Sequence, residues 1–259
     1  MNEIQSILAI AYRDFVKFLR DRNRLIATFV FPILFIGVLG SSFQSGLGSA
    51  LGYDYRLFVF LGVIAQTLFQ STAAGIISLT EDREQDFSQE IFVSPISRFS
   101  IVIGKILGET SVAIAQIIGI ILFGFIIQVP FQIGAVLSLV PFFLIVSFFG
   151  GAFGIFVVSF LGQGRGAREV FPFLIFPQFF LAGVFNPIKQ LDPVLSVLTY
   201  VAPMRYAVDL LRSVYYAGSS SFDKTVLLSM WLNLLVICIL GGILFVYGTY
   251  RFTRKETNR

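Results

Sequence analysis

The sequence predicts an all-α polytopic membrane protein with six transmembrane helices. Its 259 residues are 56% hydrophobic and only 13% charged, whereas soluble chains carry about 25% charged residues. A helix that crosses the hydrocarbon layer, about 30 Å thick, needs about 20 mostly apolar residues. Several charge-free stretches reach this length, so composition and spacing both place the chain in a membrane.

The lengths of the charge-free stretches set the number of spans. Residues 25–53, 57–80, 170–188 and 225–250 each fit one crossing. Residues 110–164 are too long for one crossing and are divided by Gln128, Pro130 and Gln132, so they hold two. We expect one transmembrane domain over residues 1–259, with spans at residues 25–43, 57–80, 101–128, 133–161, 170–187 and 225–249.

The distribution of Lys and Arg predicts the orientation. Fourteen of the 19 basic residues lie in the N-terminal segment, in the connection after the second span together with the start of the third, in the connection after the fourth span or in the C-terminal tail. Cytoplasmic segments are enriched in Lys and Arg. Six spans place both termini on one side, and the basic residues predict that this side is cytoplasmic. The net charge of +4 is explained by this bias, so no nucleic-acid partner is expected.

Residues 1–24 predict a cytoplasmic amphipathic helix. Apolar residues recur there at helical spacing, and Arg13, Lys17 and Arg20 lie away from the apolar stripe. Such a helix is suited to the inner headgroup layer; a helix buried in cytoplasmic protein is the alternative. In the first span we expect Pro32 to bend the helix.

Residues 81–100 form a cytoplasmic loop that is both acidic and aromatic. It contains Glu81, Asp82, Arg83, Glu84, Phe87, Phe92, Ser94 and Pro95. One interpretation is a solvated connection between spans. The other is a short helix that docks a soluble partner, with Phe87 and Phe92 as anchors.

Residues 188–224 predict short extracellular helices that dip into the outer leaflet. Pro193 begins the first and Pro203 begins the second, which runs to about residue 217. Arg205, Asp209 and Arg212 follow each other at i, i+4 and i+7, the spacing of ion pairs along a helix.

Polar residues inside the spans are candidates for a transport path, because a bilayer disfavours them elsewhere. Gln66 and Gln70 lie one helical turn apart in the second span, and Gln178 lies in the fifth. We expect the fifth span to be short and bent. The aromatic residues beside Pro177 on this span, Phe176, Phe179 and Phe180, predict an apolar lining of the transport path.

Alternatively, each of these glutamines forms a hydrogen bond that holds two helices together. Lys105 and Glu109 of the third span have ion-pairing spacing and predict a structural pair near the inner surface.

Several chemistries are excluded by composition. The chain has no His and one Cys, which excludes disulfides and His-ligated metal sites. It contains no G-x-x-x-x-G-K-[ST] phosphate loop, so any ATP must be bound by another chain. We expect no catalytic residues, no metal and no cofactor on this chain.

Two motifs resemble the permease subunit of type-2 ATP-binding cassette (ABC) exporters. In the first, an acidic loop beginning at Glu81 leads to Ser94-Pro95, Arg98 and Gly104-Lys105. The second runs from Asn186-Pro187 through Asp192-Pro193 to residues 202–212, which read Ala-Pro-Met-Arg-Tyr-Ala-Val-Asp-Leu-Leu-Arg. Together with the amphipathic N-terminus and Pro32, the resemblance covers essentially the whole chain.

The resemblance implies a complex of several subunits. A second permease, as a homodimer, and two cytoplasmic ABC ATPase subunits are the expected partners, with ATP and magnesium bound by the ATPase. The loop at residues 81–100 would couple the ATPase to the spans. The expected location is a cell (inner or plasma) membrane, or an organellar membrane of bacterial descent.

The resulting function is export of a hydrophobic or amphipathic substrate, either a drug-like molecule or a lipid, from the cytoplasm or inner leaflet. A drug-exporter-like branch of the family is expected from the second motif. Export of a lipid-linked polysaccharide is one alternative, and a passive channel or membrane scaffold is another.

Overall fold

The computed structural model describes residues 3–84, 97–161, 165–187 and 193–257. Within these ranges every regular element is a helix, which confirms the predicted all-α fold. η1 is a π-helix and the other elements are α-helices. In chain order the elements are α1 (Glu3–Arg20), α2 (Arg22–Pro32), η1 (Ile33–Gly40), α3 (Ser41–Leu51), α4 (Tyr55–Glu84), α6 (Arg98–Ile126), α7 (Ile133–Leu137), α8 (Val140–Leu161), α9 (Arg165–Leu181), α10 (Pro193–Val201), α11 (Pro203–Tyr215), α12 (Phe222–Thr225) and α13 (Met230–Thr257).

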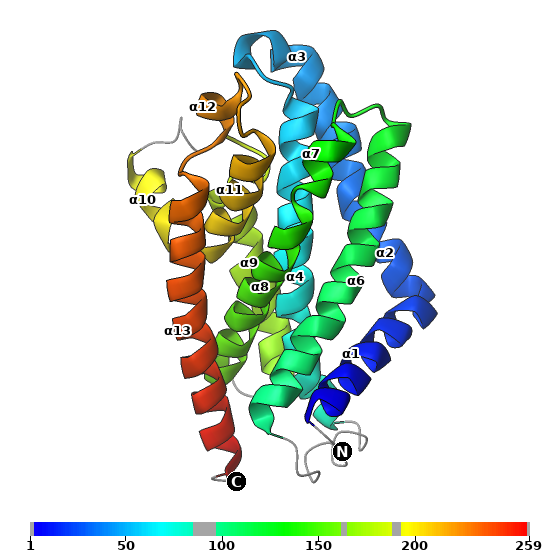
Figure 1. Cartoon of the computed structure of the whole chain (residues 1–259), viewed down its shortest axis with the longest axis vertical. Helices are drawn as coiled ribbons and strands as arrows, with labels where there is room; N and C mark the ends of the chain where they lie inside the picture. Colours follow the sequence, from blue (N-terminus) through cyan, green and yellow to red (C-terminus); the bar gives the residue numbers. More distant parts are fainter. Residues whose placement is uncertain (1–2, 85–96, 162–164, 188–192, 258–259) are drawn as a thin grey trace.

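Five segments of the described chain are long and apolar enough to cross a bilayer: Arg22–Gly46, Tyr55–Ser78, Phe99–Ile126, Val140–Leu161 and Phe222–Arg254. The span predicted at residues 170–187 falls on α9, which has 17 residues and is followed by a turn. The start of α1 and the end of α13 lie at the same end of the bundle (Figure 1). A chain that begins and ends at the same end of the bundle must cross it an even number of times. α9 and the turn after it therefore form a sixth, shorter crossing.

Two prolines change the predicted spans. α2 ends at Pro32, after which the chain continues as η1, so the disturbance expected there is a change of helix type. The predicted fourth span divides into α7 and α8. Pro141 lacks the N–H that would bond to the carbonyl of Leu137, which explains this interruption.

The core is centred on α4, which lies between α6 and α8 (Figure 1). Leu61, Ile64, Leu68 and Phe69 of α4 are fully buried. Gly154 allows α8 to approach α4 closely, because a Cβ atom there would lie 2.6 Å from the carbonyl oxygen of Ala73. Small residues at helix contacts serve this purpose in membrane bundles.

The N-terminal helix α1 packs along the first half of α6. A Cβ atom on Gly108 would lie 3.1 Å from the Cα atom of Ala11, so the two helices are in close contact. The packed face of α1 contains Ser6, Ile10, Asp14 and Phe18, which are buried. The opposite face exposes the apolar side chains of Ile4, Leu8, Tyr12 and Leu19. The headgroup location of this exposed face stays a prediction.

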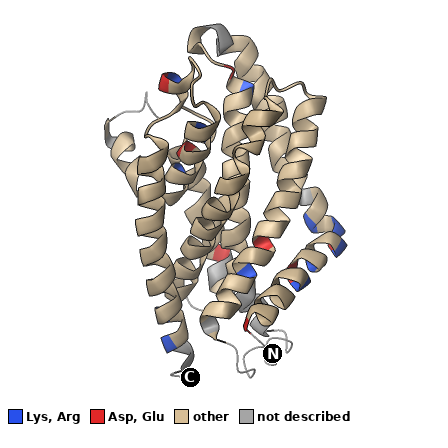
Figure 2. Ribbon diagram, viewed as in Figure 1, with Lys and Arg blue, Asp and Glu red and all other residues tan. Residues whose placement is uncertain are grey.

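Charged residues are sparse along the helices of the bundle (Figure 2). Lys and Arg of α1 and α2 lie in the half of the bundle that also holds both chain ends (Figure 2). At the other end, α10 and α11 begin at Pro193 and Pro203, as the sequence predicts.

Candidate functional site

A pocket of about 260 Å³ opens between α2, α4, α6 and α9. Four of its lining residues are apolar: Phe31, Pro32, Ala74 and Phe179. The remaining lining residues are polar: Arg24, Thr28, Gln66, Thr67, Gln70, Ser71 and Gln116. So many polar side chains inside a bundle of apolar helices identify this pocket as the candidate functional site.

The two glutamines predicted for the second span both line the pocket. The Gln66 Nε2 atom donates a hydrogen bond to Gln70 Oε1 at 2.9 Å. Gln66 is only 3% exposed, and its Oε1 atom has no hydrogen-bond partner among the described residues. An acceptor that is buried without a partner carries a free-energy cost, so a ligand that donates to it would relieve that cost.

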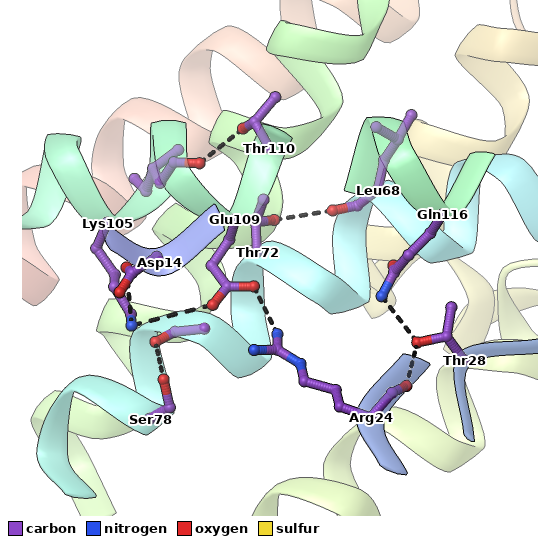
Figure 3. A network of polar contacts seen from close by, with 12 residues as sticks. Asp14, Arg24, Thr28, Leu68, Thr72, Ser78, Lys105, Glu109, Thr110 and Gln116 are labelled. Atoms are coloured by element: carbon purple, nitrogen blue, oxygen red, sulfur yellow. Dashed lines mark hydrogen bonds and ion pairs between the residues drawn. The ribbon is translucent and has the colours of Figure 1, made fainter. Parts of the chain in front are cut away.

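A second chain of hydrogen bonds joins α6 to α2 across the pocket (Figure 3). The Gln116 Nε2 atom donates to Thr28 Oγ1 at 3.1 Å, and Thr28 Oγ1 donates to the carbonyl oxygen of Arg24 at 2.8 Å. Gln116 therefore holds two helices together and also lines the pocket, so its two possible roles are not exclusive.

The end of the pocket that Arg24 lines lies beside a cluster of charged residues, whose contacts Figure 3 shows. Arg24 Nη2 lies 2.8 Å from Glu109 Oε2, and Lys105 Nζ lies 3.0 Å from Asp14 Oδ2. The pair expected between Lys105 and Glu109 is present at 4.0 Å, the longest distance in the cluster. The side chains of Asp14, Lys105 and Glu109 are almost fully buried. The charges compensate one another, as buried charges must.

Sequence reasoning missed Asp14 and Arg24. Asp14 lies seven residues after Ile7 and four before Phe18, so it falls on the apolar stripe of α1. An acidic residue on an apolar stripe is the signal that indicates a buried partner. Arg24 precedes the first span and has no such signal, because bases at span ends are common.

The three aromatic residues predicted as a lining have different positions. Phe179 lines the pocket, where its ring centroid lies 5.3 Å from that of Phe31. Phe176 and Phe180 are not among the lining residues and are about half exposed on α9. Residues at i, i+3 and i+4 share one face of a helix, so spacing alone predicts a common lining. Only Phe179, the one buried member of the three, lines the pocket.

Gln178 has a structural role. It is buried, and its Oε1 atom accepts a hydrogen bond from the backbone N–H of Met204 at 3.2 Å. Its Nε2 atom donates to the carbonyl oxygen of Leu174 at 3.1 Å. This side chain joins α9 to the first turn of α11 and does not line the pocket.

Asp209 has different partners from those that its spacing predicts. Its carboxylate accepts hydrogen bonds from the backbone N–H groups of Leu227 and Leu228, at 2.7 and 2.8 Å. It also accepts one from Asn233 Nδ2 at 2.8 Å. No ion pair within 4 Å joins it to Arg205 or Arg212 in the described chain. Burial raises the pKa of Asp209 above its ordinary value, and the three hydrogen bonds oppose this rise.

The arginines on either side of Asp209 bind neutral groups. Arg205 donates to the hydroxyl of Thr199 and stacks 4.1 Å from the ring centroid of Tyr200. Arg212 donates to the backbone carbonyls of Phe58, Gly183 and Val184 at 2.8–3.1 Å. Burial lowers the pKa of Arg212 to about 10, so it remains charged at neutral pH. The side chains that α11 buries face three separate elements, which is why spacing along α11 alone mispredicts the partners.

The predicted coupling loop is described only at its edges. α4 continues to Glu84, so Glu81, Asp82, Arg83 and Glu84 extend the helix of the second span. Phe87, Phe92, Ser94 and Pro95 lie outside the described residues. α6 begins at Arg98, three residues earlier than predicted, and Ser97 caps it by accepting the backbone N–H of Ser100.

Comparison with known proteins assigns this arrangement to a family. The model of the ABC-2 type transporter family matches residues 5–216. The chain is 25% identical to a putative transport permease ycf38 of Cyanophora paradoxa, over 86% of this chain and 78% of that protein. The ycf38 protein of Porphyra purpurea is 24% identical, over 95% of this chain and 87% of that protein.

A bacterial relative is also similar. The probable multidrug ABC transporter permease YbhR of Escherichia coli strain K12 is 28% identical over 76% of this chain, which spans 53% of that protein. The family match covers most of the present sequence, including both motifs named above. The chain therefore belongs to the ABC-2 type transporter family and is a membrane permease subunit of an ABC transporter.

Proposed function

We propose that this permease exports a hydrophobic or amphipathic molecule, drug-like or lipid, and that the pocket between α2, α4, α6 and α9 is part of its path. The observation that carries the proposal is the buried, unpartnered Oε1 atom of Gln66 in a pocket lined by both amides and aromatic rings. Such mixed lining fits a molecule with polar and apolar parts better than an ion, which needs rings of charge or carbonyls.

A separate ABC ATPase, binding ATP and magnesium, would supply the energy. In this proposal two ATPase subunits dock on the loops at residues 81–100 of two identical permeases. α4 supports such coupling, because it is continuous from the pocket to Glu84. The 14 residues from Gln70 to Glu84 span about 21 Å of α-helix. A displacement of the loop would therefore move the pocket glutamines directly.

The name of the Escherichia coli relative, a probable multidrug permease, favours drug-like cargo. A lipid-linked glycan is the second candidate, and the seven polar lining residues favour it, since sugars present many hydroxyl groups. Both candidates use the same pocket and differ in the cargo that stimulates the ATPase.

The test is reconstitution with candidate ABC ATPase subunits from the genome that encodes this chain. The complex is assembled in lipid vesicles, and ATP hydrolysis is measured with drug-like amphiphiles and with lipid-linked glycans. We expect stimulation by cargo, lost in the variant Gln66→Leu/Gln70→Leu. The control Gln128→Leu alters a glutamine in the turn after α6, away from the pocket lining. Equal stimulation in both variants would remove the pocket from the path.

A further inference from the structure

The pocket has a positive end, a polar wall and an aromatic end. Arg24 is its only charged lining residue. Its side chain is 36% exposed, and the only hydrogen bond from its guanidinium in the described structure is the one from Nη2 to Glu109. A guanidinium has five N–H donors. Several donors of Arg24 therefore remain for a bound molecule.

The acidic residues nearby compensate part of this charge from behind the pocket wall. Glu109 is 1% exposed, and its carboxylate lies between Arg24 and Lys105. The neighbouring Asp14 is 2% exposed and pairs with Lys105. Both carboxylates lie behind the lining, so the charge that faces a ligand is positive.

α4 provides the polar wall. Gln66, Gln70 and Ser71 lie along it, and both Gln66 Oε1 and Ser71 Oγ are buried without a hydrogen-bond partner in the described chain. Gln66 Oε1 can only accept. The eight residues from Gln66 to Ala74 span about 12 Å. A ligand that satisfies this wall must carry donor groups along its length, away from its charged end.

The aromatic end lies opposite Arg24. Phe31 and Pro32 follow Arg24 by about two turns of α2, and Phe179 of α9 contacts Phe31. Since α4 runs antiparallel to α2, these rings lie at the level of Gln66, while Arg24 lies near Gly75, beside Glu109. The apolar surface of Phe31 and Phe179 therefore lies across from Gln66, the glutamine of the polar wall that is farther from Arg24.

The geometry points to an elongated facial amphiphile as the cargo: one negative terminal group, hydroxyl or amide donors along one edge, and an apolar opposite face. The inference rests on the proposed function and names the substrate class of the same pocket. The negative group binds Arg24, the donors bind Gln66 and Ser71, and the apolar face contacts Phe31 and Phe179. Unbranched acyl chains and cationic amphiphiles match the pocket less well.

Three steroid probes that share one ring system test the negative group and the hydroxyl donors separately. Cholate carries a carboxylate and three hydroxyl groups. 5β-Cholanate keeps the carboxylate and lacks the hydroxyls, and 5β-cholane-3α,7α,12α,24-tetrol keeps the hydroxyls and lacks the charge. Binding of each radiolabelled probe to the full chain in phosphatidylcholine nanodiscs is measured below the micellar concentration. We expect cholate to bind at least about fivefold more tightly than either analogue.

Variants then assign each preference to a residue. Arg24→Gln should abolish the preference for cholate over the tetrol, and Arg24→Lys should keep most of it. Gln66→Leu/Ser71→Ala should abolish the preference for cholate over cholanate. The matched control is Arg22→Gln, an exposed arginine two residues before Arg24 that does not line the pocket; it should change neither preference.

Equal binding of all three probes to the wild-type chain would overturn the inference without reference to any variant. So would a preference that survives both Arg24→Gln and Gln66→Leu/Ser71→Ala. If Gln66→Leu/Gln70→Leu abolishes cargo-stimulated ATP hydrolysis while the probes bind equally, the path stands and only the substrate class is wrong.

Discussion

The guanidinium of Arg212 lies 3.4 Å from the ring centroid of Phe58 and donates a hydrogen bond to the carbonyl oxygen of that same residue at 3.0 Å. The same guanidinium binds the carbonyls of Gly183 and Val184, in the turn after α9. One buried side chain of α11 thus fixes the N-terminal end of α4 to the turn that follows α9. Position 62 of α4, near this contact, must be a glycine, because a Cβ atom there would lie 2.6 Å from the carbonyl oxygen of Val184.

Replacing Arg212 with Lys should destabilise the protein although the charge is kept. An ammonium cannot reach three carbonyls in the geometry of a planar guanidinium. Carbonyls left buried without a donor cost about 1–3 kcal/mol each, so we expect a loss of at least about 2 kcal/mol. Thermal unfolding in nanodiscs measures this loss of stability. Arg56→Lys is the control, since Arg56 makes only a longer contact of 3.8 Å with Asp54. Equal stability of both variants would contradict this prediction.

Asp209→Asn should also destabilise the protein. The amide would place a donor where the carboxylate accepts from Leu227, Leu228 and Asn233, at a cost of about 2 kcal/mol. The exchange variant Asp209→Asn/Asn233→Asp restores an acceptor opposite the new donor. We expect it to recover part of the lost thermal stability. A double variant as unstable as the sum of the single variants would show that the two side chains do not interact.

The charged cluster should tolerate removal of a pair better than removal of one member. Lys105→Met leaves Asp14 buried with fewer compensating charges, at a cost of about 3 kcal/mol or more. Removing both charges in Lys105→Met/Asp14→Leu should cost less than Lys105→Met alone. Thermal stability of the two variants in the same nanodiscs decides between these outcomes; the reverse order would mean that Lys105 does not compensate Asp14.

Gly154 should not accept a side chain. Its Cβ atom in Gly154→Ala would lie 2.6 Å from the carbonyl oxygen of Ala73, so α8 and α4 must move apart. We expect a loss of about 1–3 kcal/mol, the usual cost of overpacking. Gly242→Ala on α13 is the control, because in the described chain no atom beyond the local backbone of its own helix lies within 4 Å of its Cβ position. The two variants are compared by thermal unfolding, and equal loss in both would show that the contact with Ala73 is not the cause.

The coupling-loop hypothesis predicts a defect in assembly alone. Glu84→Ala/Phe92→Ala should lose the ATPase subunit on co-purification while the permease still inserts into the membrane. The two residues belong to the acidic and aromatic parts of the loop, which would both contact the partner. Asp223→Ala, which alters an exposed acidic residue of α12, is a control for loss of acidic charge elsewhere in the chain. Normal assembly and ATP hydrolysis with Glu84→Ala/Phe92→Ala would contradict the hypothesis.

Much of the fold follows from local sequence. The starts of α10 and α11 at Pro193 and Pro203 were predictable, because proline favours the first position of a helix. The glutamines of the pocket were predictable too, since amides in a span need a polar neighbour. The span boundaries were less predictable: Pro141 interrupts the fourth span, and α9 ends at Leu181, seven residues before the charge-free stretch at residues 170–188 ends.

By itself, the sequence determined the membrane environment, the all-α class and the family, because these depend on composition, spacing and short motifs. Only the tertiary structure decided which polar groups meet. Asp209 binds backbone N–H groups 18 and 19 residues further along the chain, and Arg24 reaches Glu109 across 85 residues. Spacing along one helix predicts contacts within that helix alone. In the low dielectric of a packed interior, a buried charge needs a compensating group beside it. The packing of the helices against one another determines which group that is.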